Sequence, residues 1–147
     1  MNANASIEIL LVDDDLDDRN TFQDALSDLK IATNLTLLED GRRLLDYLQN
    51  HRKPDLLFLD LNMPYKSGLE CLMDIRKHSA FDDLSIAIYS TSSTEKDVEN
   101  TFIYGANVYI RKPNNFAELK RVLGEVVNMN FQFQHSGLNK DTFLLSL

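Results

Sequence analysis

Polar side chains that could bind a metal ion or a phosphoryl group directly follow four short apolar segments of the sequence. Carboxylates follow the first and third segments, hydroxyl groups end the fourth, and a lysine follows the fifth; the residues are Asp13, Asp14, Asp15, Asp60, Asn62, Ser90, Thr91 and Lys112. In open parallel sheets, ligands bind outside the carboxyl ends of the strands. If the segments are parallel strands, carboxylates, a hydroxyl group and an ammonium group therefore meet at one edge.

These residue types fit the chemistry of a phosphoryl group. Two carboxylates about 5 Å apart repel each other by roughly 3 kcal/mol at an effective dielectric constant of about 20, so the carboxylates require a cation. Oxygen ligands that include one or two carboxylates are typical of Mg²⁺, which keeps several waters and bridges to phosphoryl oxygens. Lys112 supplies a fixed positive charge for the far side of the same group. The set predicts phosphoryl transfer, in which positioning and charge neutralisation provide most of the catalysis.

The elements that would position these residues follow from the apolar pattern. Nearly continuous apolar segments, typical of strands covered on both faces, or weaker segments bounded by turn residues predict five strands at residues 7–12, 34–38, 55–59, 86–89 and 107–110. Between them apolar residues recur with helical period, and a fifth helical stripe runs from Phe116 to about Asn128. Strands alternate with helices, which predicts an α/β fold, a doubly wound five-stranded parallel sheet with five helices on its two faces.

Single residues add detail to this prediction. Gly41 and Gly68 stand at helix starts, and Gly105 follows the fourth helix, where a residue with positive φ is expected. Cys71 lies on the apolar stripe of the third helix and is expected in the core.

Length and composition limit the classes of protein. The chain has 147 residues, enough for one domain, and its formal net charge of −8 opposes binding to nucleic acid. A single cysteine allows no internal disulfide, and no apolar segment reaches the roughly 18 residues of a membrane span. We expect a cytoplasmic protein that binds neither nucleic acid nor membrane, with one domain at residues 6–128 and an extension at 129–147 of unknown role.

Four motifs in a fixed order resemble the receiver domain of two-component response regulators, over roughly residues 6–128. They are VDDD at 12–15, LDLNMP at 59–64, YST at 89–91 and YIRKP at 109–113. Each motif is weak alone, but the four together at these spacings are highly specific. The resemblance implies a flavodoxin-like fold with receiver topology and a single-domain protein similar to the chemotaxis regulators. The STS run at 90–92 and the stretch HSAFDDLS at 78–85 are similar to the small regulators that accompany phytochrome-type or hybrid sensor kinases.

The same resemblance implies a role for each site residue. Asp60 would be the phosphoacceptor, attacking the phosphorus of a phosphohistidine or a small acyl phosphate. Mg²⁺ would be held by Asp13, Asp14, Asp60 and the backbone carbonyl of Asn62. Lys112 would pair with Asp60 at rest and with the phosphoryl oxygens afterwards.

The switch residues also follow from the resemblance. Ser90 would move its hydroxyl to the phosphoryl group, and Tyr109 would turn inward with it. Asn62 and Ser92 would flank the phosphoryl group and tune its hydrolysis. The bond between Lys112 and Pro113 is expected to be cis, which is inexpensive only before proline.

Other interpretations of the same residues remain open. Asp15, Asp17 and Asp18 fit a solvated acidic turn that leads into a helix, where the helix dipole favours carboxylates. A calcium loop of the EF-hand type fails because Asp18 stands where glycine is needed. The LDLNMP motif is also similar to haloacid-dehalogenase phosphatases, but Asn62 replaces their acid/base aspartate and cannot exchange a proton. Tyr109 could be simple packing at the edge of the sheet.

The sequence therefore predicts a stand-alone response regulator of a phosphorelay. It would accept a phosphoryl group on Asp60 from a histidine kinase or phosphotransfer protein, and signal through phosphorylation-dependent binding of another protein. No turnover enzyme is expected; the alternative is a pseudo-receiver that is never phosphorylated and acts as an interaction module. The binding surface would lie on the fourth helix, fifth strand and fifth helix, with candidates Lys96, Glu99, Ile103, Tyr104, Tyr109 and Arg111. The extension could support a homodimer.

Overall fold

A computed structural model describes residues 6–135 and 144–145 of the chain. Its strands are β1 (Ile7–Val12), β2 (Thr33–Leu38), β3 (Leu56–Leu59), β4 (Ser85–Ser90), β5 (Val108–Arg111) and a two-residue β6 (Leu144–Leu145). Its α-helices are α1 (Leu16–Ser27), α2 (Leu44–Asn50), α3 (Gly68–Arg76), α4 (Glu95–Ile103) and α5 (Phe116–His135), with short 3₁₀ turns at Gly41–Arg43 and Ser79–Phe81. The five predicted strands are all present within one or two residues, the five predicted helices are all present, and the fifth helix ends later than predicted.

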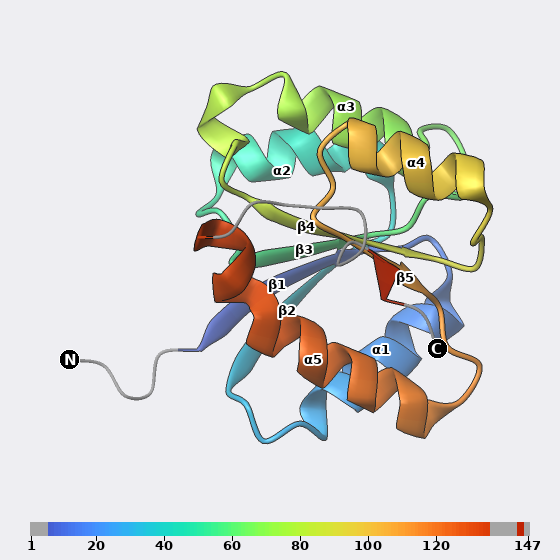
Figure 1. The fold of residues 1–147 in the computed structure, drawn as a ribbon. Helices are drawn as coiled ribbons and strands as arrows, with labels where there is room; N and C mark the ends of the chain where they lie inside the picture. Colours follow the sequence, from blue (N-terminus) through green and yellow to red (C-terminus); the bar gives the residue numbers. More distant parts are fainter. Residues whose placement is uncertain (1–5, 136–143, 146–147) are drawn as a thin grey trace.

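All neighbouring strands are parallel, in the order β2-β1-β3-β4-β5-β6. Figure 1 shows α1 and α5 on one face of this sheet and α2, α3 and α4 on the other. The strand order reverses at β1, because β2 and β3 lie on opposite sides of it. This arrangement confirms the doubly wound, flavodoxin-like fold.

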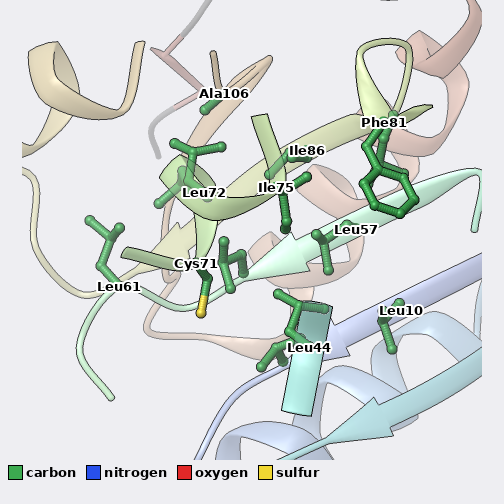
Figure 2. Close-up of a cluster of buried hydrophobic side chains, with 14 of the residues drawn as sticks. Leu10, Leu44, Leu57, Leu61, Cys71, Leu72, Ile75, Phe81, Ile86 and Ala106 are labelled. Carbon is green, nitrogen blue, oxygen red and sulfur yellow. The ribbon is translucent and has the colours of Figure 1, made fainter. Parts of the chain in front are cut away.

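Alternate residues of each central strand feed two separate cores, because successive side chains point to opposite faces. On β1, Ile9 and Leu11 pack with the helices α1 and α5, while Leu10 and Val12 pack with α2, α3 and α4. Figure 2 shows part of the second core, where Leu10, Leu57 and Ile86 from three strands cluster with Leu44, Leu72 and Ile75 from two helices; Cys71 is buried there, as predicted.

Helix ends carry the expected signals. Asp15 caps α1 by accepting a hydrogen bond from the Asp18 amide, and Ser67 forms a capping box with Glu70 at the start of α3. Gly105 follows α4 with φ of +100°, which confirms the predicted left-handed C′ position.

The C-terminal part differs from the prediction. Helix α5 continues to His135 instead of ending near Asn128, and β6 pairs through its backbone with β5, with Leu144 opposite Tyr109. The segment 136–143 belongs to the predicted extension and lies outside the described residues. A role of the extension in dimerisation therefore stays a prediction. Within the described ranges, no helix combines the length and apolar character needed to cross a bilayer.

Candidate functional site

The carboxyl ends of β1, β3, β4 and β5 bring the predicted site residues to one edge of the sheet. The strands are in register, so that Val12 lies opposite Leu59 and Ser90 lies opposite Arg111. The pairing continues one residue beyond the strands: the amide of Asp60 donates to the Val12 carbonyl, and the amide of Lys112 donates to the Ser90 carbonyl. Asp60 and Lys112 are therefore each fixed by the backbone of a neighbouring strand.

Three carboxylates converge at this edge. Asp13, Asp14 and Asp60 each offer an oxygen within 4.8 Å of the others, with Asp13 and Asp60 buried and Asp14 exposed. The Oδ2 atom of Asp13 is buried and accepts no hydrogen bond of good geometry from the described residues, and its charged neighbour is the Lys112 ammonium, 2.8 Å away. An all-oxygen donor set with such an atom fits a hard divalent cation, and Asp13, Asp14 and Asp60 are the side chains that could hold it. Asn62 lies beside them: its amide donates to Asp60 Oδ1 at 3.3 Å.

Lys112 reaches into the same cluster. Its Nζ atom lies 2.7 Å from Asp18 Oδ2, 2.8 Å from Asp13 Oδ2 and 3.7 Å from Asp60 Oδ2. Only the contact with Asp18 has the geometry of a hydrogen bond. The ammonium is thus shared among three acids, and Asp60 is the most distant of them.

The electrostatics of the site follow from burial and from these contacts. Burial raises the pKa of Asp60 to about 7; Lys112 opposes this shift, and the nearby charge of Asp13 adds to it. Burial by itself would lower the pKa of Lys112, but Asp13 and Asp18 outweigh burial and raise that pKa. Lys112 therefore remains a cation, whereas the metal-free Asp60 is easily protonated.

A second group of hydrogen bonds joins the site to α4. The Ser90 hydroxyl is fully buried and accepts a hydrogen bond from the Ser92 amide at 3.1 Å. The Tyr109 hydroxyl donates to the Ser92 carbonyl at 2.6 Å, and the Ser92 hydroxyl donates to Asp97 of α4. The loop after β4 is consequently held by both β5 and α4.

Gly68 lets the first turn of α3 approach Asp60. A β-carbon at Gly68 would lie 2.1 Å from the Asp60 carbonyl oxygen, and the Gly68 amide donates to the Leu61 carbonyl at 2.9 Å. No larger residue fits here without moving the backbone that carries the central carboxylate.

The sequence pattern of the response regulator receiver domain matches residues 9–124, most of the chain. The chain belongs to this family. The predicted membership of the receiver family is confirmed, together with the fold and the general function as a receiver of two-component signalling.

Relatives of this receiver include other response regulators, one of which is a phytochrome response regulator. The response regulator Rcp1 of Synechocystis sp. is 31% identical over 121 residues, which cover 78% of this chain and 82% of Rcp1. The crystal structure of Mn²⁺-bound Rcp1 has a TM-score of 0.75 at 29% identity, covering 90% of this chain and 99% of that one. The phosphorylated cyanobacterial phytochrome response regulator RcpA has a TM-score of 0.78 at 28% identity, covering 91% and 99%. The predicted resemblance to the phytochrome-associated sub-group is thereby confirmed.

The structure corrects the predictions made for the Lys112–Pro113 bond and for Tyr109. The bond between Lys112 and Pro113 is trans rather than cis, in line with the general trans preference, and Lys112 still reaches the acids. Tyr109 was predicted on the exposed binding surface, but it is fully buried because its ring packs in the core beneath α4 while its hydroxyl binds the loop after β4.

The acidic turn after β1 contains a site residue that the sequence interpretation missed. Asp15 and Asp17 are exposed, as expected of a solvated turn, but Asp18 is half-buried and pairs with Lys112. The available signal was spacing: once Asp15 is the N-cap of α1, Asp18 occupies the third helical position, which folds back towards the cap.

Proposed function

We propose that Asp60 is the phosphoacceptor of this receiver, and that a histidine kinase or a histidine phosphotransfer protein is the donor. The observation that carries the proposal is the position of the buried Asp60 carboxylate, between the oxygens of Asp13 and Asp14 and the ammonium of Lys112. An Asp60 oxygen would form a bond to phosphorus while the bond from phosphorus to the donor nitrogen, or to the oxygen of an acyl phosphate, breaks. The histidine or carboxylate of the donor leaves with the electron pair.

We propose Mg²⁺ as the metal ion, held by Asp13, Asp14, Asp60 and the carbonyl of Asn62. The exclusively oxygen donors support this choice, and the Mn²⁺-bound form of Rcp1 supports a divalent cation in a similar receiver. A bound Mg²⁺ would neutralise charge on the phosphoryl oxygens. Lys112 adds a second positive charge from the protein, and burial of Asp60 keeps bulk water from the carboxylate.

The phosphoryl group would act as a switch through Ser90. Its hydroxyl is close enough to the Ser92 amide to accept a hydrogen bond from it, and would rotate to donate to a phosphoryl oxygen. That rotation would withdraw the bond that holds the loop after β4, whose carbonyl also binds Tyr109. We propose that the resulting shift of α4 selects a downstream protein, by population of a second conformation.

The docking surface would comprise the exposed residues of α4, of the turn that follows α4, and of β5. Ile103 is 68% exposed and Tyr104 is 42% exposed, while the exposed Lys96 of α4 and Arg111 of β5 supply positive charge. These apolar and charged groups suit a protein partner better than a small ligand. We propose no turnover activity, because the product of the reaction would be the receiver itself, carrying the phosphoryl group. We also propose a cytoplasmic location and a homodimer.

Because RcpA is a phytochrome response regulator, a sensor of the phytochrome type is the donor class that the similarity favours. The pseudo-receiver alternative requires the loss of a functional acid or of the lysine, yet the chain has Asp13, Asp14, Asp60 and Lys112.

Phosphorylation by acetyl phosphate tests the proposal directly. Intact-mass spectrometry should find one added phosphoryl group in the presence of Mg²⁺ and none with a chelator. Asp60→Asn should abolish the addition, whereas Asp83→Asn should not, since Asp83 precedes β4 at the opposite edge and pairs with Lys53. Unmodified wild-type protein, or equal labelling of Asp60→Asn, would contradict the assignment.

A further inference from the structure

Asp18 holds the ammonium of Lys112 by a contact that the receiver reaction does not require. The hydrogen bond from Lys112 Nζ to Asp18 Oδ2 is 2.7 Å long, while the nearest oxygen of Asp60 is 1.0 Å farther away, at 3.7 Å from the same nitrogen. The Lys112 side chain is only 9% exposed, so the ammonium has few other partners. The position of Lys112 therefore depends on Asp18 as well as on Asp13.

The protein backbone fixes Asp18 in this position. The Asp15 carboxylate accepts from the Asp18 amide at 2.9 Å, and the Asp15 amide donates to Asp13 Oδ1 at 3.0 Å. Arg19, the next residue, donates to the Asp13 carbonyl at 2.8 Å. The first turn of α1 is thus bound to the end of β1 on both sides of Asp18.

The net charge of the site makes the contact between Asp18 and Lys112 important for binding an anion. Asp13, Asp14, Asp18 and Asp60 carry four negative charges when all are ionised and Lys112 carries one positive charge, which leaves a net charge of −3. Of these acids, only Asp18 lies outside the group whose oxygens converge within 4.8 Å. It adds negative charge to a site that must accept an anion, and it occupies the lysine that would bind that anion.

We propose that Asp18 is a positioning residue that competes with the phosphoryl group for Lys112. In the unphosphorylated protein Asp18 keeps the ammonium away from Asp60; on phosphorylation Lys112 has to leave Asp18 in order to bind the phosphoryl oxygens. Asp18 thereby weakens the phosphorylated state and sets the position of the switch equilibrium. This inference rests on the proposed function of Asp60.

Beryllofluoride, a phosphoryl mimic, tests the competition in full-length protein with saturating Mg²⁺. Asp18→Asn should bind it about tenfold more tightly than wild type, a change of about 1.4 kcal/mol. Asp17→Asn is the matched control: it removes the same charge from the same helical turn, but Asp17 is exposed and forms no ion pair within residues 6–135. The Asp17→Asn variant should bind beryllofluoride with wild-type affinity. The Asp18→Glu variant keeps the negative charge, and its affinity should be close to that of wild type.

A double-mutant cycle separates competition for the lysine from a general charge effect. In a Lys112→Gln background, replacing Asp18 by asparagine should no longer change the affinity, because the shared cation is gone. An undiminished effect in that background, or equal effects of Asp17→Asn and Asp18→Asn, would overturn the inference while leaving Asp60 as the phosphoacceptor. Failure of the wild type to bind beryllofluoride would overturn both proposals.

Discussion

Replacing Asp60 by asparagine should stabilise the metal-free protein above neutral pH. Burial raises the pKa of Asp60 to about 7 in the folded state, against 3.8 for the ordinary carboxyl group. As pH rises, the unfolded chain releases this proton first, and the folded protein follows only near pH 7. Stability from this group is therefore fully present below about pH 3.8, falls as pH rises, and is lost once the folded-state pKa has been passed. An asparagine side chain has no such titration.

The magnitude follows from the difference between the two pKa values. A shift from 3.8 to about 7, at about 1.4 kcal/mol per unit, corresponds to up to about 4 kcal/mol. The Asp60 side chain is only 6% exposed, so little of this is screened by solvent. Lys112 keeps Asp13 and Asp18 as partners in the variant, so the substitution leaves no unpaired cation.

Urea unfolding of wild type and Asp60→Asn in chelator, followed by circular dichroism across this pH range, measures the effect. The difference in free energy of unfolding should grow from near zero at about pH 4 to its full value above about pH 7. Asp17→Asn controls for the loss of one surface charge. Adding Mg²⁺ should reduce the difference, because wild type gains the binding free energy of the ion. A difference that does not change with pH, or a less stable Asp60→Asn at alkaline pH, would refute the argument.

Four further substitutions test how the site is supported. Arg76→Met should lower the free energy of unfolding in urea by about 3 kcal/mol or more, because Arg76 donates to four backbone carbonyls and one side-chain amide around the start of β4 and the end of α4; an unchanged value would contradict this. Gly68→Ala should destabilise the protein and slow phosphorylation of Asp60, whereas Gly124→Ala in α5, where a β-carbon meets only ordinary contacts, should stabilise it by about 0.5–1 kcal/mol. Tyr109→Phe should cost about 1 kcal/mol and shift the amide resonances of the loop after β4.

The sheet was predictable because both of its faces are covered. Continuous apolar segments such as Leu56–Leu59 have all their residues buried, which leaves few alternatives to a central parallel strand. The parallel order then sends Asp13, Asp60 and Lys112 to the same edge without any knowledge of side-chain contacts. This is why the site could be predicted from residues that are far apart in the chain.

The end of α5 was less predictable because nothing in the sequence stops the helix at Asn128. The apolar stripe ends there, but the next glycine is Gly137, and the intervening residues contain no proline. The helix consequently continues to His135. A change in amphipathic pattern marks where packing changes and does not by itself end a helix.

The partner of Lys112 was unpredictable for a different reason. Sequence placed Lys112 at the edge of the sheet, but the choice between Asp60 and Asp18 depends on differences of about 1 Å among carboxylates. Such differences arise from the start of α1, where the capping residue Asp15 sets the direction of the first turn. Types of residue are fixed by pattern, whereas their pairing depends on local geometry.

Contacts lead from the site to helices on opposite faces of the sheet. Lys112 lies near Asp60 and pairs with Asp18 on α1, and Ser90 is joined through Ser92 to α4, which lies across the sheet from α1 (Figure 1). A phosphoryl group would compete for the lysine on the first side and for the Ser90 hydroxyl on the second. Under the proposed function, the α1 side would set how easily the phosphorylated state forms, and the α4 side would transmit that state because Ser92 is bound to α4. Substitutions at Asp18 should therefore change occupancy of the switch without changing the structure of the activated α4 face.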